Sequence, residues 1–418
     1  MKEGYKQTKI GLLPQDWEIQ KINDFTKVTS GATPSTNKAD FWGGDILWMN
    51  SGELNLKKIY DVEGRITELG FKSTSTKLLP KNCVLIGLAG QGKTRGTAAI
   101  NKVELCTNQS IAAIWPNKIT NESFLYYYLD SKYDDLRKLS TGDGGRGGLN
   151  LGLIGSFFMP IPLIEEQNVI ANCLSTWDEA IEKQQKLIEA KEIRHKALMQ
   201  KLLSGKKRLP GFSDESKEVK LGDFANSYSG LSGKNKDDFG TGKPYISYMN
   251  VFSNSIINND IYDLVSISDH ENQNKVQYGD ILFTVSSETP TEAGMVSVYL
   301  NESSEDVYLN SFCFGVRLQT LDILNPRFAS FLLRFDDFRK EVFKLAQGST
   351  RYNISKSGIL NIKFKIPTLE EQLSITKILE STEKEIEIEK KKVDQLKEQK
   401  KALMQKLLTG KVRLPLQN

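Results

Sequence analysis

The chain repeats itself at an almost constant distance, and this repeat limits its architecture more than any other feature. IPLIEEQ at 161–167 recurs as IPTLEEQ at 366–372, and KALMQKLLSGKKRLP at 196–210 recurs as KALMQKLLTGKVRLP at 401–415. Both recurrences are 205 residues apart (366 − 161 and 401 − 196). Since internal similarity of this kind marks tandem copies of one structural unit, the sequence predicts two similar halves.

The segments between these anchors have diverged. The pair MN at 49–50 matches MN at 249–250, only 200 residues on, so the loops differ in length between the copies. The stretch at 85–100 has almost nothing in common with the stretch at 282–300. We therefore expect one scaffold that carries two different surfaces.

A fragment of the repeated motif occurs a third time, near the N-terminus. LLP at 12–14 precedes Trp17 as RLP at 208–210 precedes Phe212, and RLP returns at 413–415. This predicts that the two ends of the chain lie near each other.

Each repeated segment has the boundaries of a long helix. Pro162 and Pro367 suit a first turn, and Gly205 and Gly410 supply C-terminal stops. Roughly 40 residues at about 1.5 Å each would form rods of about 60 Å.

Apolar residues recur along both segments every three or four positions, which predicts a heptad seam. The predicted seam residues are Leu174, Trp177, Ile181, Ile188, Leu198 and Leu202 in the first helix and Leu379, Ile386, Val393, Leu396, Leu403 and Leu407 in the second. Antiparallel pairing about a pseudo-two-fold axis would place Lys191 beside Glu389 and Trp177 near Leu403, with the two globular domains at opposite ends. On the heptads alone, helices that merely stabilise a dimer are an equally good interpretation.

The remaining segments alternate short apolar strands with turns rich in Gly, Asn and Ser. Strands are expected at 82–86, 111–115 and 280–283, and helical stretches at 124–139 and 327–345. The predicted fold class is α+β, with two similar domains that are each followed by a long helix. The predicted boundaries are 1–160 for the first domain, 161–205 for its helix, 206–218 for a linker, 219–365 for the second domain, 366–410 for its helix and 411–418 for a tail.

Composition narrows the possible functions. A chain of 418 residues is too long for one core, and its net charge of +4 permits a nucleic-acid partner without demanding one. The four cysteines are far apart, and the two histidines, His195 and His270, nearly exclude histidine triads and multi-His metal sites. The polar N-terminus and the lack of a long apolar run predict a cytoplasmic protein.

Residues 87–94, GLAGQGKT, satisfy the phosphate-loop pattern G-x-x-x-x-G-K-[ST] and follow an apolar strand, which would predict an NTPase. Against this interpretation, Gly96 interrupts the expected helix and the aligned segment at 284–294 has no such motif. No two prolines are adjacent, so the Asn/Asp-Pro-Pro-Tyr/Phe motif of amino-methyltransferases is missing as well.

Paired polar loops offer groups for DNA phosphates and base edges. Arg146 and Arg351 stand 205 residues apart in loops before the long helices, although flexible loops explain the neighbouring glycines equally well. The candidate DNA-binding residues are Thr33, Ser35, Lys38, Gln91, Lys93, Thr94, Arg95, Arg146, Ser232, Lys234, Lys236, Ser287, Thr289, Arg351, Tyr352 and Asn353.

The order of domain and I-P-x-x-E-E-Q helix, repeated once, resembles the specificity (S) subunits of Type I restriction-modification systems. SGATPS at 30–35, LAGQGKTRG at 88–96 and the repeated KALMQKLL carry the same resemblance, which spans essentially the whole chain. It implies two target-recognition domains that each bind one half of an interrupted, asymmetric DNA site. It also implies that the helices form a spacer and that GQGKT belongs to a recognition domain.

The resemblance further implies the partners. Two modification subunits would bind S-adenosylmethionine and methylate adenine, and restriction subunits would add ATP- and Mg-dependent translocation and cleavage. This chain would then hold no catalytic residue, metal or cofactor of its own. A coiled-coil adaptor without any DNA role is the alternative that the heptads also allow.

Overall fold

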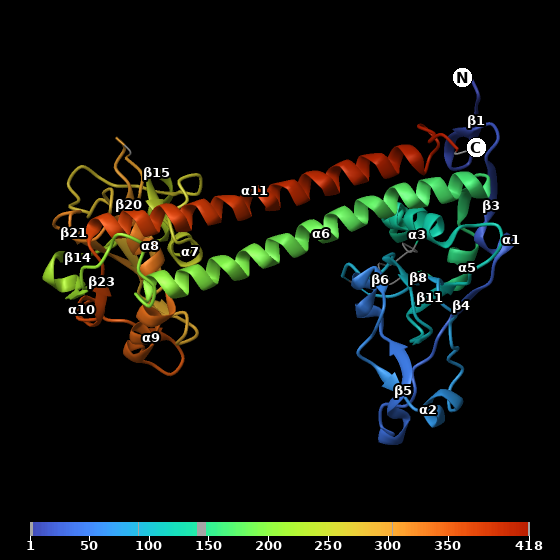
Figure 1. The fold of residues 1–418 in the computed structure, drawn as a ribbon, viewed down its shortest axis with the longest axis horizontal. Helices are drawn as coiled ribbons and strands as arrows, with labels where there is room; N and C mark the ends of the chain where they lie inside the picture. Colours follow the sequence, from blue (N-terminus) through green and yellow to red (C-terminus); the bar gives the residue numbers. More distant parts are fainter. Residues whose placement is uncertain (1–2, 91, 140–147, 303, 417–418) are drawn as a thin grey trace. The chain divides into compact units, whose positions relative to one another are not determined.

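The structure, a computed structural model, describes residues 3–90, 92–139, 148–302 and 304–416 (Figure 1). Its contacts divide the chain into two compact units, residues 1–185 with 391–418 and residues 186–390. Each unit combines a globular part of mixed strands and helices with a segment of each long helix, α6 (Ile164–Leu203) and α11 (Leu369–Leu407).

The first unit is built on a five-stranded sheet of order β4-β11-β8-β9-β6. Its strands are β4 (Val28–Ser30), β11 (Ile111–Ile114), β8 (Val84–Gly87), β9 (Ala98–Asn101) and β6 (Lys58–Ile59). All neighbours are antiparallel except β6 and β9. The strands β8, β9 and β11 are buried along their whole length, as expected for apolar runs covered on both faces.

Smaller elements surround this sheet. They are the pairs β1 (Tyr5–Thr8) with β2 (Gly11–Pro14) and β3 (Glu18–Lys21) with β12 (Phe158–Ile161), a sheet of β10 (Cys106–Thr107), β5 (Trp42–Met49) and β7 (Arg65–Ile66), and the helices α1 (Ile22–Phe25), α2 (Glu68–Lys72), α3 (Glu122–Ser131), α4 (Tyr133–Leu139) and α5 (Leu151–Gly155), with 3-10 turns at Ala39–Phe41 and Ser51–Leu56.

The second unit has a four-stranded antiparallel sheet of order β14-β21-β17-β19. Its strands are β14 (Ala225–Ser229), β21 (Cys313–Leu318), β17 (Ile281–Thr284) and β19 (Val296–Val298). The other elements are a sheet of β16 (Asp263–Val265), β15 (Phe239–Ile246) and β20 (Tyr308–Leu309), the pairs β13 (Lys217–Lys220) with β23 (Lys363–Ile366) and β18 (Ser286–Ser287) with β22 (Tyr352–Asn353), the helices α7 (Tyr248–Ser253), α8 (Pro326–Leu332), α9 (Asp336–Leu345) and α10 (Lys356–Leu360), and 3-10 turns at Leu221–Asp223 and Lys236–Asp238.

The expected strands are present with ends shifted by one or two residues, but each expected helical stretch is divided. Residues 124–139 form α3 and α4, and residues 327–345 form α8 and α9. The long helices also begin two residues after Pro162 and Pro367, so the predicted place of these prolines in the first turn is wrong. Strands β12 and β23 extend to the residue before each proline, which keeps the backbone there extended.

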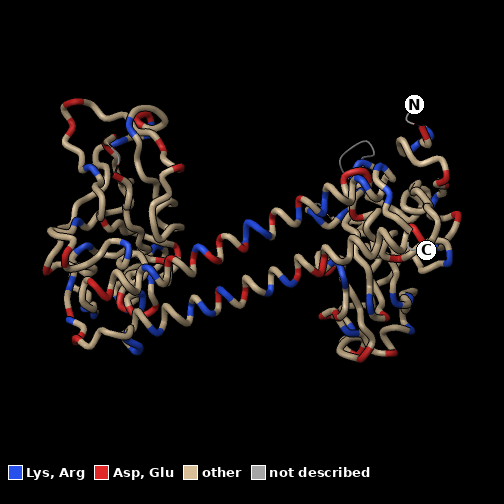
Figure 2. Tube along the Cα trace, turned by 45° about the horizontal axis from the view of Figure 1, so that its top comes forward, with Lys and Arg blue, Asp and Glu red and all other residues tan. Residues whose placement is uncertain are grey.

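The long helices end where the glycines predict. Both Gly205 and Gly410 have positive φ, +70° and +65°, which suits the residue that terminates a helix. All predicted seam residues are buried or half-buried, whereas Ile193 and Ile388, off the seam, are 71% and 55% exposed. Along both helices, positions with Lys or Arg and positions with Asp or Glu alternate with other residues (Figure 2).

Polar contacts join the helices within the second unit, among them an ion pair of 2.6 Å between Lys390 and Glu192. Lys191 Nζ lies 2.9 Å from Glu389 Oε1, which confirms the predicted contact. His195 Nδ1 lies 2.6 Å from Thr382 Oγ1, so His195 is a polar residue of the helix interface. No helix in the part of the chain that the structure describes is long and apolar enough to cross a bilayer.

The two ends of the chain meet in the first unit, as the third copy of the motif predicted. The hydroxyl of Tyr5 donates a hydrogen bond of 2.8 Å to the carbonyl of Gly410. Arg413 forms an ion pair of 2.8 Å with Asp16.

Candidate nucleic-acid interface

Two predicted DNA-binding segments of the second unit, 65 positions apart in the chain (352 − 287), lie side by side in the structure. Strand β18 pairs antiparallel with β22, so that Ser287 is opposite Tyr352 and Ser286 is opposite Asn353. The next backbone hydrogen bond, from the N–H of Ile354 to the carbonyl of Val285, is 2.9 Å long. This pairing fixes the loop before Tyr352 relative to the central strand β17.

That loop is a closed turn. Gln347 and Asn353 exchange two backbone hydrogen bonds of 3.1 and 2.8 Å. Gly348 has φ +136°, and a Cβ there would lie 1.9 Å from the carbonyl oxygen of Arg351, so only glycine fits. The turn therefore holds Arg351 at a defined place.

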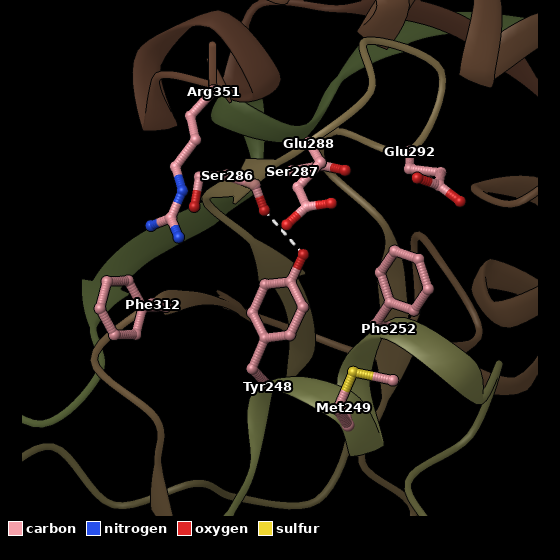
Figure 3. A pocket seen from close by; sticks show the side chains of 9 residues that line it. All are labelled: Tyr248, Met249, Phe252, Ser286, Ser287, Glu288, Glu292, Phe312 and Arg351. Atoms are coloured by element: carbon pink, nitrogen blue, oxygen red, sulfur yellow. Dashed lines mark hydrogen bonds between the residues drawn. The ribbon is translucent and has the colours of Figure 1, made fainter.

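Arg351 borders a pocket of about 480 Å³ (Figure 3). We call it the recognition pocket, and its lining residues are Tyr248, Met249, Phe252, Ser286, Ser287, Glu288, Glu292, Phe312 and Arg351. Helix α7 supplies one wall, where the rings of Tyr248 and Phe252 stack with centroids 5.9 Å apart. The hydroxyl of Tyr248 donates a 2.7 Å hydrogen bond to the carbonyl of Ser286, and burial raises the pKa of Tyr248, which keeps this donor protonated.

The rim of the recognition pocket exposes groups that suit base edges. Met249 and Phe312 are 58% and 56% exposed, although large apolar side chains usually avoid water. Arg351 is exposed, and no hydrogen bond or ion pair within the described residues engages its guanidinium. In protein–DNA complexes generally, arginine recognises guanine through two hydrogen bonds, a carboxylate can accept from the cytosine amino group, and apolar side chains contact the thymine methyl group.

Other candidates of the second unit have structural partners. The ammonium of Lys234 donates to Glu271 Oε1 at 2.6 Å and to the carbonyl of Ser266 at 2.6 Å. Hydrogen bonds from Lys234, Gln273 and Ser268 lower the pKa of Glu271 to about 2. The Lys234 side chain is only 6% exposed, and its contacts with Glu271 and Ser266 stabilise the loop that carries it.

The remaining candidates of this unit lie at its surface. Ser232 is exposed, and its carbonyl accepts a 2.8 Å hydrogen bond from the side-chain amide of Gln273. Thr289 donates to Glu292 Oε2 at 2.6 Å, beside the recognition pocket. Lys236 is exposed at the start of a 3-10 turn.

In the first unit, Lys93, Thr94 and Arg95 lie in the loop between β8 and β9. The two strands pair antiparallel, and the described residues after the motif lead into β9 without a helix. A phosphate-binding loop needs the N-terminus of a helix at this point, so the geometry speaks against the NTPase alternative. Helix α4 holds the loop, since Arg137 donates to the carbonyl of Gly92 at 2.7 Å.

Lys93 is exposed at the tip of this loop, and the hydroxyl of Tyr133 fixes its carbonyl at 3.0 Å. Gln91 and Arg146 lie outside the described residues.

The turn with Thr33, Ser35 and Lys38 is exposed and held from below by tryptophans. Trp42 Nε1 donates to the carbonyl of Ser35 at 3.1 Å, and Trp48 Nε1 donates to the carbonyl of Ala32 at 3.0 Å. Thr33 Oγ1 donates to Gln109 at 2.7 Å, and Lys38 Nζ lies 5.0 Å from the centre of the Phe41 ring. The structure thus places the described first-unit candidates in two separate loops.

Sequence reasoning missed the residues that attach each globular part to the helices. Buried Glu166 accepts from Arg413 Nε at 2.8 Å, and buried Glu371 accepts from Arg208 Nε at 2.9 Å. Both pairs join the E-E-Q motif to the R-L-P motif, at equivalent positions of the repeat. The recurrence of both motifs at one interval was the signal that could have suggested this contact.

No group of three or more His, Cys, Asp or Glu side chains among the described residues could hold a metal ion. What the described surface offers instead is hydrogen-bond donors, acceptors and apolar contacts on two differing domains.

Comparison with known proteins agrees with this architecture. The family model of the Type I restriction modification DNA specificity domain matches twice, at residues 14–192 and 213–398. The Type I restriction enzyme MjaVIII specificity subunit of Methanocaldococcus jannaschii is 25% identical over 99% of this chain and 96% of its own length.

Solved structures share the fold. A chain from a structure titled "Structural basis underlying complex assembly and conformational transition of the type I R-M system" has a TM-score of 0.64 at 16% identity, covering 96% of this chain and 99% of its own. The HsdS subunit from Thermoanaerobacter tengcongensis has a TM-score of 0.54 at 17% identity, covering 96% of this chain and 98% of its own. The chain therefore belongs to the Type I restriction modification DNA specificity family, whose domain it carries twice.

Proposed function

We propose that this chain is the DNA-recognising specificity subunit of a Type I restriction-modification complex and that it binds an asymmetric, interrupted DNA site. One observation carries the proposal: the two units attach their globular parts through equivalent residue pairs, Arg413 with Glu166 and Arg208 with Glu371, while their candidate DNA-binding surfaces differ. Two unlike surfaces on one scaffold are what recognition of two unlike half-sites requires.

In this proposal the recognition pocket belongs to the protein surface that enters the DNA major groove. Arg351, Glu288 and the apolar rim would contact base edges, and exposed lysines such as Lys93 and Lys236 would contact phosphates. Phosphate contacts supply affinity on any sequence, whereas base contacts supply the specificity.

Helices α6 and α11 would form an antiparallel coiled coil with pseudo-two-fold symmetry, which separates the recognition domains and sets the length of the unread spacer. The buried seam and the Lys191–Glu389 contact support this arrangement. The same helices would offer the docking surface for two modification subunits.

The chain itself would be non-catalytic. S-adenosylmethionine would bind to the modification subunits, which methylate adenine, and ATP and Mg to restriction subunits, which translocate and cleave DNA. The antiparallel hairpin at the phosphate-loop motif, where an NTPase loop would lead into a helix, supports this division of work.

Selection from random duplexes tests the proposal. The purified complex of this chain with a Type I modification subunit should enrich two short conserved blocks at a fixed separation. A single block, or no enrichment above the salt-sensitive background of nonspecific binding, would overturn the proposed function.

A further inference from the structure

The second unit has an open pocket where the first unit has a buried tryptophan. Strand β3 pairs Glu18 with Ile161, and β13 pairs Lys217 with Ile366 at the equivalent point of the repeat. The residue just before the strand is Trp17 in the first unit and Ser216 in the second. Strand register thus makes Ser216, and not Phe212, the counterpart of Trp17.

Trp17 closes the end of helix α11 in the first unit. Its side chain is fully buried, and its Nε1 donates a 3.0 Å hydrogen bond to Glu166 Oε2. A Cβ at Gly410 would lie 2.4 Å from Pro14 and 3.3 Å from Trp17, so the surroundings of this glycine are filled.

The corresponding place in the second unit is vacant. A Cβ at Gly205, the counterpart of Gly410, would meet no atom within 4 Å. A pocket of about 370 Å³ occupies this region, and we call it the Ser216 pocket. Its lining residues are Leu202, Leu203, Ser204, Gly205, Arg208, Glu215, Ser216, Lys365, Pro367, Glu371 and Ile375, so polar and charged side chains surround the apolar ones.

The Ser216 pocket shares two features with the surroundings of Trp17, a pair of leucines and a buried carboxylate. Leu202 and Leu203, which are 5% and 8% exposed, repeat the apolar floor that Leu407 and Leu408 form in the first unit. The buried carboxylate of Glu371 repeats Glu166, but among the described residues it accepts from the side chain of Arg208 and, at 3.4 Å, from the backbone N–H of Leu209, whereas Glu166 accepts from the side chains of Arg413 and Trp17. Two leucines beside a carboxylate that, among the described residues, accepts from a single side chain suit an aromatic ring with an N–H donor.

We propose that the Ser216 pocket binds a tryptophan side chain presented by a partner polypeptide, in the position that Trp17 fills from within the first unit. The indole ring would cover Leu202 and Leu203, and its N–H would donate to Glu371. Because only one of the two repeats has this vacancy, the site would distinguish the second unit from the first for a partner that contacts both.

Binding of N-acetyl-tryptophanamide to the full chain tests this inference without DNA or partner proteins. The unfolding temperature of the wild-type chain should rise saturably with the compound, at the weak affinity expected of a small ligand. N-acetyl-phenylalaninamide, which lacks the indole N–H, should bind about tenfold more weakly, because it leaves Glu371 without the additional donor.

Substitutions at Ser216 provide the matched controls. Ser216→Trp should fill the pocket, raise the unfolding temperature and abolish binding, whereas Ser216→Ala should leave the pocket open and bind like wild type. Ser216→Phe serves as a second blocking variant if the tryptophan variant does not fold. Absence of saturable binding to the wild-type chain, or binding that persists in a folded blocked variant, would overturn the inference.

Discussion

Gln167 and Gln372 make the same three hydrogen bonds in the two units. Gln167 Nε2 donates to the carbonyls of Pro162 and Ile119 at 2.8 and 3.0 Å, and its Oε1 accepts from the backbone of Asn121 at 2.8 Å. The corresponding bonds of Gln372, to Pro367, Ile323 and Asn325, are 3.0, 2.9 and 2.9 Å long. The glutamine of the E-E-Q motif therefore connects each long helix to the N-terminus of α3 or α8.

Replacing either glutamine should destabilise its own unit. Gln167→Leu leaves two carbonyls and one N–H without their partner, which predicts a loss of at least about 3 kcal/mol, since each of the three unsatisfied buried groups costs about 1–3 kcal/mol. Thermal unfolding of the whole chain, combined with hydrogen exchange measured separately for the residues of each unit, measures this loss. The control is Glu165→Gln, an exposed neighbour on the same turn, and an equal loss in that variant would contradict the assignment.

Acid should weaken the first unit through Asp178. Burial alone would raise the pKa of this carboxylate, but hydrogen bonds from Lys400 and Tyr127 and the charges of Lys400 and Lys58 outweigh burial and lower it. A lowered folded pKa means stabilisation that is complete above the unfolded value of 3.8 and is lost as the pH falls through the folded pKa. Unfolding curves between pH 2 and about pH 6 should show this loss, and Asp178→Asn should flatten it.

The counterpart of Asp178 in the second unit, Glu383, should respond in the opposite direction. Burial raises the pKa of Glu383, and the charge of Arg327 compensates only in part. Its unit should therefore lose stability as the pH rises from the unfolded value of 4.5 through the folded pKa. Glu383→Gln should remove this dependence, and a first-unit response in that variant would contradict the prediction.

Charge reversal tests the register of the two helices. Lys191→Glu and Glu389→Lys should each lower the unfolding temperature of the second unit, because each places like charges at the 2.9 Å contact. The double reversal should recover most of the loss. Strictly additive losses in the double variant would mean that the two residues do not interact.

Arg351 and Lys93 should differ in what they contribute to DNA binding. Arg351→Ala should weaken binding to the specific site by about 1–3 kcal/mol and relax the sequence requirement at one position. Lys93→Ala should weaken binding to all duplexes. It should also reduce the slope of log affinity against log salt concentration by about one, which corresponds to one phosphate contact. Arg351→Lys is the informative control, since full recovery by lysine would indicate a phosphate contact instead of a base contact.

Much of this architecture could be predicted from the sequence because it depends on local, periodic patterns. The repeat, the seam, the helix-ending glycines and the Lys191–Glu389 contact all follow from spacing along the chain. The break between α3 and α4 at Lys132 could not be predicted, since the apolar pattern continues across it. Whether a glycine-rich loop leads into a helix or a strand depends on the sheet around it. The phosphate-loop motif at Lys93 therefore predicts a helix, although strand β9 follows the loop.

The site residues could be predicted only in part, because they come together through long-range packing. Ser287 and Arg351 are separate polar residues in the sequence, and strand pairing makes them neighbours. Nothing local marks Tyr248, Met249 or Phe312 as pocket residues, since aromatic and apolar residues near strands usually belong to the core.

Mapping of methylated adenines tests the central proposal most directly. This chain should be co-expressed with a Type I modification subunit in a host without adenine methylation, and the host genome should then be sequenced by a single-molecule method. The account predicts one interrupted, asymmetric motif methylated on both strands, with one half changed when residues 1–160 are exchanged for another recognition domain. A stable complex that methylates no such motif, together with ATP hydrolysis by the lone chain that Lys93→Ala abolishes, would contradict it.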